Sequence, residues 1–263
     1  MPVGNFGRVK AWNDFTAIPP IAAADTVPLA NGSLLGGGWS LHGENEGTVT
    51  SLADEPGGVL SLVTDTGDND NIAVSAGVWQ PADGGMECEF RIKIPTSVAA
   101  TRASAWVGFT ETLVVATPVM PFETATTTTT YNGSGGMVGF GFDSDATAIR
   151  WRFAAGDAGA ALATVEPDGT VGTALGIIAP ATITADRWWV FRVEVDVDGL
   201  ARGYIGDAAG NDQQQRLVGT TTAAVGAGDN FHATFIGENR SAANEEFEID
   251  YAYAQGWRDW SAD

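Results

Sequence analysis

Cysteine and histidine are nearly absent from this chain of 263 residues. Cys88 is the only cysteine, which excludes an internal disulfide framework. The two histidines, His42 and His232, are far apart in the sequence, and with one cysteine they do not give the ligand spacing of a zinc site. We expect a structural hydrogen bond for each histidine and a small buried side chain at Cys88.

Positive charge is also scarce. The chain has 13 basic against 33 acidic residues, a formal net charge of −20, and lysine occurs only at Lys10 and Lys93. A surface this negative repels nucleic acid and anionic membranes, so we expect neither as a partner. No apolar stretch approaches the length of a membrane span, and residues 1–8 contain no signal-peptide core. These absences predict synthesis and folding in a cytoplasm.

What the sequence does contain is alternation of apolar and polar residues, broken by turn residues. In residues 187–199, Trp189, Phe191 and Val193 fall on one face of a strand, while Arg192 and Glu194 fall on the other. Strands are predicted over residues 59–64, 72–76, 86–94, 105–113, 137–142, 148–153, 160–166, 188–197, 200–205, 231–238 and 246–255. Many such strands with Gly and Asx turns predict an all-β fold, a two-sheet antiparallel jelly-roll sandwich.

Residues 1–56 have a different pattern, with proline pairs and glycine triplets but little periodicity. We expect an irregular N-terminal arm there and a sandwich domain over residues 57–263. Residues 114–136, with five consecutive threonines, predict a long exposed loop or an extended hairpin. Both irregular stretches are natural places for contacts with partners.

The strand phrases resemble a known fold family. The segments that carry the resemblance are residues 60–62, 90–94, 189–196 and 247–253. They are similar to the concanavalin A-like, laminin-G-like jelly roll. Residues 12–15, 64–71, 106–110 and 138–146 further resemble structural proteins of tailed-bacteriophage virions that carry this fold. The resemblance implies a fold more strongly than a function.

Some relatives in this fold class hydrolyse glycans with alternating carboxylates on one strand. Glu248 and Asp250 begin such a phrase, but the second glutamate is missing. Glu194, Asp196 and Asp198 also alternate, with Asp198 beside a turn. A polar outer strand face explains both groups, and we expect no enzymatic activity.

Two other features leave alternatives open. Residues 65–71 are rich in Asp and Asn, which suits either calcium or, more simply, a hairpin turn. We therefore expect no metal or cofactor. Among the nine tryptophans, we expect Trp106, Trp151 and Trp189 in the core. The tryptophans near strand ends could be exposed, and they suit either burial in the core or a subunit contact, or else a platform for sugar rings; they are Trp79, Trp188, Trp257 and Trp260.

The leading sequence-based hypothesis is a non-enzymatic virion protein that decorates or stabilises the outside of a bacteriophage head, bound to the major capsid protein. The alternative is a carbohydrate-binding module of a tail fibre or cell-surface adhesin that binds host glycan; a glycan hydrolase comes third. We also expect a homo-oligomer, with a trimer favoured. The expected contact residues are Trp12, Phe15, Trp257 and Trp260.

Overall fold

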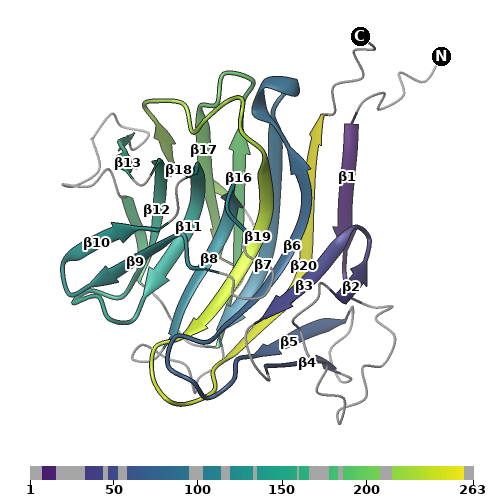
Figure 1. The fold of residues 1–263 in the computed structure, drawn as a ribbon, viewed down its shortest axis with the longest axis vertical. Helices are drawn as coiled ribbons and strands as arrows, with labels where there is room; N and C mark the ends of the chain where they lie inside the picture. The colour runs from purple at the N-terminus through teal and green to yellow at the C-terminus, as the bar shows by residue number, and fades with distance from the viewer. Residues whose placement is uncertain are drawn as a thin grey trace.

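The computed structural model describes residues 8–15, 33–43, 47–52, 58–94, 103–113, 119–132, 135–158, 160–165, 178–182, 186–207 and 215–257. Within these residues the fold is all β apart from a short 3-10 turn, η2 (Pro81–Asp83). The described part of the chain contains no helix with the length and apolarity that a bilayer crossing requires. Two large antiparallel sheets pack face to face, so the predicted sandwich is confirmed (Figure 1).

The first sheet contains nine strands within the described residues. In order across the sheet they are β14 (Thr164–Val165), β18 (Arg216–Thr221), β17 (Ala201–Asp207), β16 (Arg187–Val195), β7 (Met86–Ile94), β20 (Glu246–Trp257), β5 (Val59–Val63) and β4 (Thr48–Leu52). The ninth strand, β1 (Arg8–Asn13), pairs with the C-terminal half of β20. The β7–β16–β17 core of this sheet was predicted with nearly correct bounds.

The second sheet also contains nine strands in the described part of the chain. In order they are β13 (Ala160–Leu162), β12 (Arg150–Asp157), β11 (Met137–Asp143), β8 (Ala103–Thr110), β19 (Phe231–Asn239), β6 (Asn71–Trp79), β3 (Trp39–Gly43) and β2 (Ser33–Gly36), with β15 (Ile178–Thr182) paired to β12. A separate hairpin, β9 (Phe122–Ala125) and β10 (Thr128–Tyr131), projects beside this sheet (Figure 1).

Large aromatic side chains fill the space between the sheets. Phe191 of the first sheet lies 4.4 Å from Trp151 and 5.0 Å from Phe140 of the second, measured between ring centroids. Trp39 and Phe90 meet edge to face at 5.3 Å. These offset and edge contacts are the geometries that aromatic pairs favour. The core therefore bridges both sheets along their length.

The N-terminal part of the chain corrects a prediction. Where it is described, it is not an irregular arm, because β1, β2, β3 and β4 belong to the two sheets. Phe15 and Trp39 are fully buried. The backbone amide of Phe15 donates to the side-chain oxygen of Asn13, whose Nδ2 donates to the carbonyl of Leu35. These short strands are held by hydrogen bonds to longer neighbouring strands, such as β20 and β6. Their own alternation is too short to predict them from the sequence.

The stretch 114–136 contains the hairpin that was one of its two predicted forms. The hairpin is not simply an exposed loop, however. Met120 and Phe122 are buried, and Phe122 packs edge to face on Trp106 at 5.7 Å. The side chain of Trp106 points out of the second sheet, so the hairpin forms a small second core over it. Residues 114–118 and 133–134 of this predicted loop lie outside the described residues.

The buried position of Phe15 generates a test. Phe15→Ala should lower the free energy of unfolding by about 3–5 kcal/mol, because it removes a fully buried ring from a packed core. Urea denaturation followed by tryptophan fluorescence measures this. Val78→Ala, at a side chain that is 45% exposed, is the control and should change stability by less than about 0.5 kcal/mol. Equal effects of the two changes would contradict the placement of Phe15 in the core.

Candidate functional site on the outer face of the first sheet

The outer face of the first sheet is set by alternation along three central strands. Because Phe90 and Phe191 point into the core, Glu87, Glu89 and Glu194 point outward. The register places Glu87 of β7 between Glu194 of β16 and Gln255 of β20. Polar side chains from strands that are distant in sequence therefore line up across this face.

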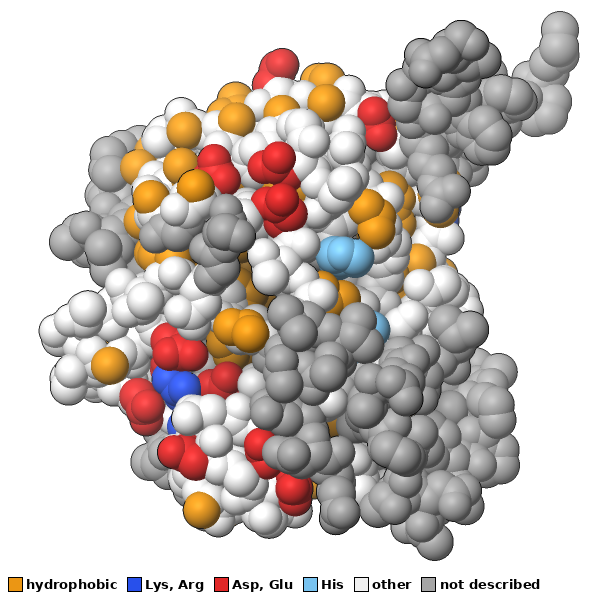
Figure 2. Space-filling model, viewed as in Figure 1, with side chains coloured by type: hydrophobic (Ala, Val, Ile, Leu, Met, Phe, Trp, Pro, Cys, Tyr) orange, Lys and Arg blue, Asp and Glu red, His pale blue; other side chains and the backbone are white. Residues whose placement is uncertain are grey.

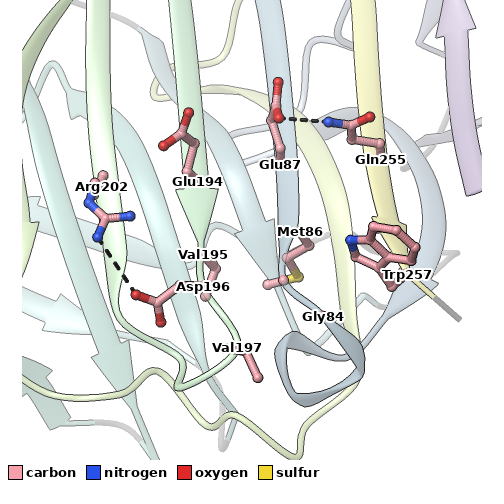
Figure 3. A pocket seen from close by; sticks show the side chains of 12 residues that line it. Gly84, Met86, Glu87, Glu194, Val195, Asp196, Val197, Arg202, Gln255 and Trp257 are labelled. Carbon is pink, nitrogen blue, oxygen red and sulfur yellow. Dashed lines mark hydrogen bonds and ion pairs between the residues drawn. The ribbon is translucent and has the colours of Figure 1, made fainter. Parts of the chain in front are cut away.

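A pocket of about 290 Å³ is lined by this row, and we call it the outer-face pocket (Figure 3). Its lining residues come from β7, β16, β17, β20 and the turns beside them: Gly84, Gly85, Met86, Glu87, Glu194, Val195, Asp196, Val197, Arg202, Gln255, Gly256 and Trp257. Trp257 forms one side, and Arg202 with Asp196 forms the other (Figure 3). The volume is near the lower end of small-ligand sites, which begin at about 300 Å³.

Hydrogen bonds and ion pairs hold two carboxylates of the outer-face pocket in place. Gln255 Nε2 donates to Glu87 Oε2 at 2.7 Å, and Arg192 lies 3.4 Å from the other oxygen of Glu87. Glu194 accepts a hydrogen bond from the hydroxyl of Tyr204 at 3.0 Å and pairs with Arg192. One guanidinium thus separates two neighbouring carboxylates that would otherwise repel each other.

Glycine allows the indole of Trp257 to form a wall of the outer-face pocket. Gly84 has a φ of 138°, and a Cβ at this position would lie 2.7 Å from the indole ring. The ring can therefore pack directly on the backbone of the turn that precedes β7. Trp257 remains 37% exposed, so part of its surface borders the pocket and solvent.

The four predicted contact residues have different positions. Trp12 is 53% exposed on the outer face, where it stacks on Tyr251. Trp257 lines the outer-face pocket. Phe15 is fully buried in the core of its own chain, so its prediction as a subunit contact is corrected. Trp260 lies outside the described residues.

The other tryptophan predictions are partly confirmed. Trp106, Trp151 and Trp189 are buried, as expected. Trp79, for which core and surface positions were both open, is only 2% exposed, because its ring lies over Gly77 and Gly256, where a side chain would collide with it.

Trp188 remains half-buried on the outer face of the first sheet. The guanidinium of Arg91 lies 4.6 Å from its ring centroid, and the ammonium of Lys93 lies 5.1 Å from it. At these distances both cations are attracted by the face of the ring.

The carboxylates considered for hydrolysis are engaged in ion pairs or turns. Glu248 pairs with Lys93 at 2.6 Å, and Asp250 pairs with Arg91. Asp196 accepts backbone hydrogen bonds from the amides at positions 198 and 200, which closes the β16–β17 turn. These contacts agree with the interpretation of a polar outer strand face.

The histidines are placed in structural positions. His42 Nε2 lies 2.6 Å from the hydroxyl oxygen of Ser75. Burial, followed by the charge of His232, lowers the pKa of His42 to about 4. Burial also lowers the pKa of His232.

The Asp- and Asn-rich segment 65–71 forms a hydrogen-bonded turn. The backbone amide of Asp70 donates to the carbonyl of Gly67, and Asn239 donates to the carbonyl of Asp65 at 2.7 Å. Within the described residues, no group of three or more His, Cys, Asp or Glu side chains is placed to hold a metal ion.

A second polar cluster lies by the β9–β10 hairpin, around Arg240. Its guanidinium forms two hydrogen bonds with the fully buried Asp143, at 2.8 and 3.2 Å, and one with Glu238 at 2.7 Å. Asp145 and Glu123 lie 3.5 and 4.0 Å from it. Acidic side chains also outnumber basic ones across the visible part of this face (Figure 2). The guanidinium occupies the centre of this acidic cluster.

One guanidinium does not neutralise both buried carboxyl groups. Desolvation raises the pKa of Glu238 from 4.5 to about 8, although Arg240 opposes the shift. Asp143 accepts two of the hydrogen bonds from Arg240, and Glu238 accepts one. Glu238 therefore holds a proton at neutral pH.

Comparison with known proteins shows a similarity of fold. No family model matches the chain, and no curated protein matches it. A solved protein of unknown function from Shewanella oneidensis MR-1 has a TM-score of 0.56 at 14% identity, over 97% of this chain and 89% of its own. The carbohydrate recognition domain of Emp47p has a TM-score of 0.50 at 12% identity, over 88% and 93% of the two chains. The chain has the concanavalin A-like jelly-roll fold. The finer resemblance to bacteriophage virion proteins stays a prediction.

Most of the outer-face pocket was missed by the sequence analysis. Trp257 was singled out, and Glu194 and Asp196 were considered as carboxylates for hydrolysis. Glu87, Gln255 and Arg202 were not noted. Their outward direction follows from alternation in the sequence, because each lies one position from a buried residue. Their convergence depends on the pairing of β7 with β16 and β20, and a single sequence does not give that register.

The Arg240 cluster generates a test of pH dependence. Because the folded pKa of Glu238 is above its ordinary value, the folded state binds an extra proton between about pH 4.5 and 8. The stability that the folded state gains from binding this proton is fully present below pH 4.5 and is lost as the pH rises through about 8. Glu238→Gln keeps the group neutral. The variant should therefore gain stability relative to the native chain as the pH rises, on the order of 5 kcal/mol in total.

Urea denaturation of the Glu238→Gln variant and the native chain, at pH values from roughly 5 to 9, measures the difference in their free energies of unfolding. Asp198→Asn removes an exposed turn carboxylate and serves as the control, with no comparable trend. A difference between the Glu238→Gln variant and the native chain that stays constant across the series would contradict the assignment.

Proposed function

We propose that this protein binds carbohydrate through the outer-face pocket. The observation that carries the proposal is the partly exposed indole of Trp257 beside a row of carboxylate, amide and guanidinium groups. A sugar ring has one apolar C–H face, which packs on an aromatic ring, and hydroxyl groups that need both donors and acceptors. Glu87, Glu194 and Asp196 supply acceptors, and Arg202 and the Gln255 amide supply donors.

The polar groups of the outer-face pocket are already ordered without a ligand. Glu87 is fixed by Gln255 and Arg192, and Glu194 by Tyr204 and Arg192. Side chains that are held before binding lose less conformational entropy when a ligand arrives. This order supports a recognition site more than an accidental hollow.

The charge of the site favours a neutral glycan. Glu87, Glu194 and Asp196 line the outer-face pocket against a single lining cation, Arg202. The whole chain carries a formal net charge of −20, so uronate-rich or sulfated polysaccharides are repelled at long range. We therefore propose neutral sugars as the ligand class, bound without cleavage of a glycosidic bond.

The structural neighbours are compatible with this proposal. The Emp47p domain is a carbohydrate recognition domain, and its similarity to this chain concerns the fold. This agrees with the sequence-based alternative of a carbohydrate-binding module. Attachment to a bacteriophage head, contact with capsid protein and trimer formation stay predictions. Labelling of the protein in intact particles would test the location.

A substitution of the aromatic wall tests the proposal. Trp257→Ala should weaken binding to a neutral glycan by about tenfold, because it removes the stacking surface worth roughly 1 kcal/mol beyond the buried area. A panel of neutral and acidic glycans, measured by calorimetry, identifies the ligand first. Glu87→Gln should weaken the same ligand, since the amide replaces one of the acceptor oxygens with a donor.

Val119→Ala is the matched control. It shortens an apolar side chain that is 43% exposed and lies just before the β9–β10 hairpin, away from the outer-face pocket. It should leave the affinity for the glycan unchanged. Failure of the native protein to bind any neutral glycan in the panel would refute the proposed function. Release of reducing sugar during incubation would show hydrolysis and refute binding without cleavage.

A further inference from the structure

A second group of aromatic side chains lies on the same face, outside the outer-face pocket. Trp12 of β1 stacks on Tyr251 of β20, with 5.4 Å between ring centroids and 21° between ring planes. Tyr253 contacts the same indole edge to face at 6.1 Å. We call Trp12, Tyr251 and Tyr253 the aromatic platform. Its rings are ordered by one another.

The aromatic platform and the outer-face pocket follow one strand. Tyr253, Gln255 and Trp257 alternate along β20 and share its outer face. Tyr253 and Trp257 are four residues apart, which corresponds to about 13 Å along a strand. The two aromatic sites are therefore separated by more than one sugar ring, with polar groups between them.

The surface between the two sites is polar and ordered. Gln255 donates a hydrogen bond to Glu87. Two residues further along the same strands, Tyr253 and Glu89 lie opposite each other and point to the same outer face. Glu89 accepts hydrogen bonds from the hydroxyl of Tyr251 at 2.6 Å and from the amide of Gln215 at 2.7 Å. A polar floor with aromatic rings at both ends suits a chain of linked sugar rings.

Trp12 is the most exposed large hydrophobic side chain among the described residues. One face of its indole packs on Tyr251, and its 53% exposure leaves much of the ring in solvent. An indole held flat and exposed in this way offers a stacking surface at low entropic cost. The same exposure suits a contact with a second copy of the chain, so the experiment must separate the two.

We propose that the ligand is an extended, neutral oligosaccharide that lies along β20, with one sugar ring at Trp257 and another on the aromatic platform at Trp12. The inference rests on the proposed function and specifies its ligand class further. It makes affinity depend on ligand length, because a short sugar reaches one aromatic site and a longer chain reaches both. Two linked contacts bind more tightly than either alone.

The experiment compares disaccharides with hexasaccharides of neutral linear glycans, namely cello-, malto-, manno-, xylo- and chito-oligosaccharides. In the native protein, the hexasaccharide of the preferred series should bind at least about tenfold more tightly than its disaccharide. Trp12→Ala should remove this gain and leave disaccharide binding unchanged. Trp12→Phe should restore most of the gain, and Trp257→Ala should weaken both ligands.

Several outcomes would overturn the inference while leaving the proposed function intact. These are equal affinity for short and long ligands, a Trp12→Ala variant that keeps the length dependence, or one that weakens both ligands equally. Light scattering on the same variants tests the alternative that Trp12 contacts a second copy of the chain. If Trp12→Ala dissociates an oligomer but keeps the dependence of affinity on ligand length, Trp12 is a subunit contact. If no neutral glycan binds, the proposed function fails and this inference fails with it.

Discussion

The packing of aromatic rings between the two sheets is the interaction on which the rest of the fold depends. Phe191 reaches Trp151 and Phe140, and Trp39 reaches Phe90, so each sheet is anchored to the other by rings. Burial of such rings is the largest apolar contribution that a side chain can make. Glycine at facing positions gives the rings room: a Cβ at position 203 would lie 2.3 Å from Phe153, and one at position 237 would lie 2.5 Å from Phe247.

Burial of one face of each strand determines what the other face can be. In β7 the buried Cys88 and Phe90 force Glu87 and Glu89 outward, and the same alternation in β16 turns Glu194 outward. Like charges opposite each other in a sheet are destabilising, and here Arg192, between Glu87 and Glu194, offsets that cost. The ordered polar row beside Trp257 is therefore a by-product of core packing together with charge compensation. The glycan site that we propose combines this row with the indole of Trp257.

The sequence predicted the strands with clear alternation and missed the four N-terminal ones. Strands such as β7 and β16 carry enough alternation to be recognised alone, and β7 was placed with correct bounds. The strands β1 to β4 have no comparable signal and depend on partners such as β20 and β6 for their hydrogen bonds. The site has the same limit: Trp257 stands out by residue type, whereas Glu87 and Gln255 become neighbours only through the register of three strands.

The two outer faces of the sandwich differ because one of them carries a second core. On the second sheet, the outward side chain of Trp106 is covered by Phe122 of the β9–β10 hairpin. The backbone amide of Thr124 in that hairpin donates to Asp143 of the sheet, which also accepts hydrogen bonds from Arg240. The outward indole of Trp106 is thus covered by the chain's own hairpin. On the first sheet, the indoles of Trp12 and Trp257 remain partly exposed on ordered supports. This difference in exposure, with Trp106 covered and Trp12 and Trp257 partly open to solvent, is the reason that we propose the first sheet as the ligand-binding face.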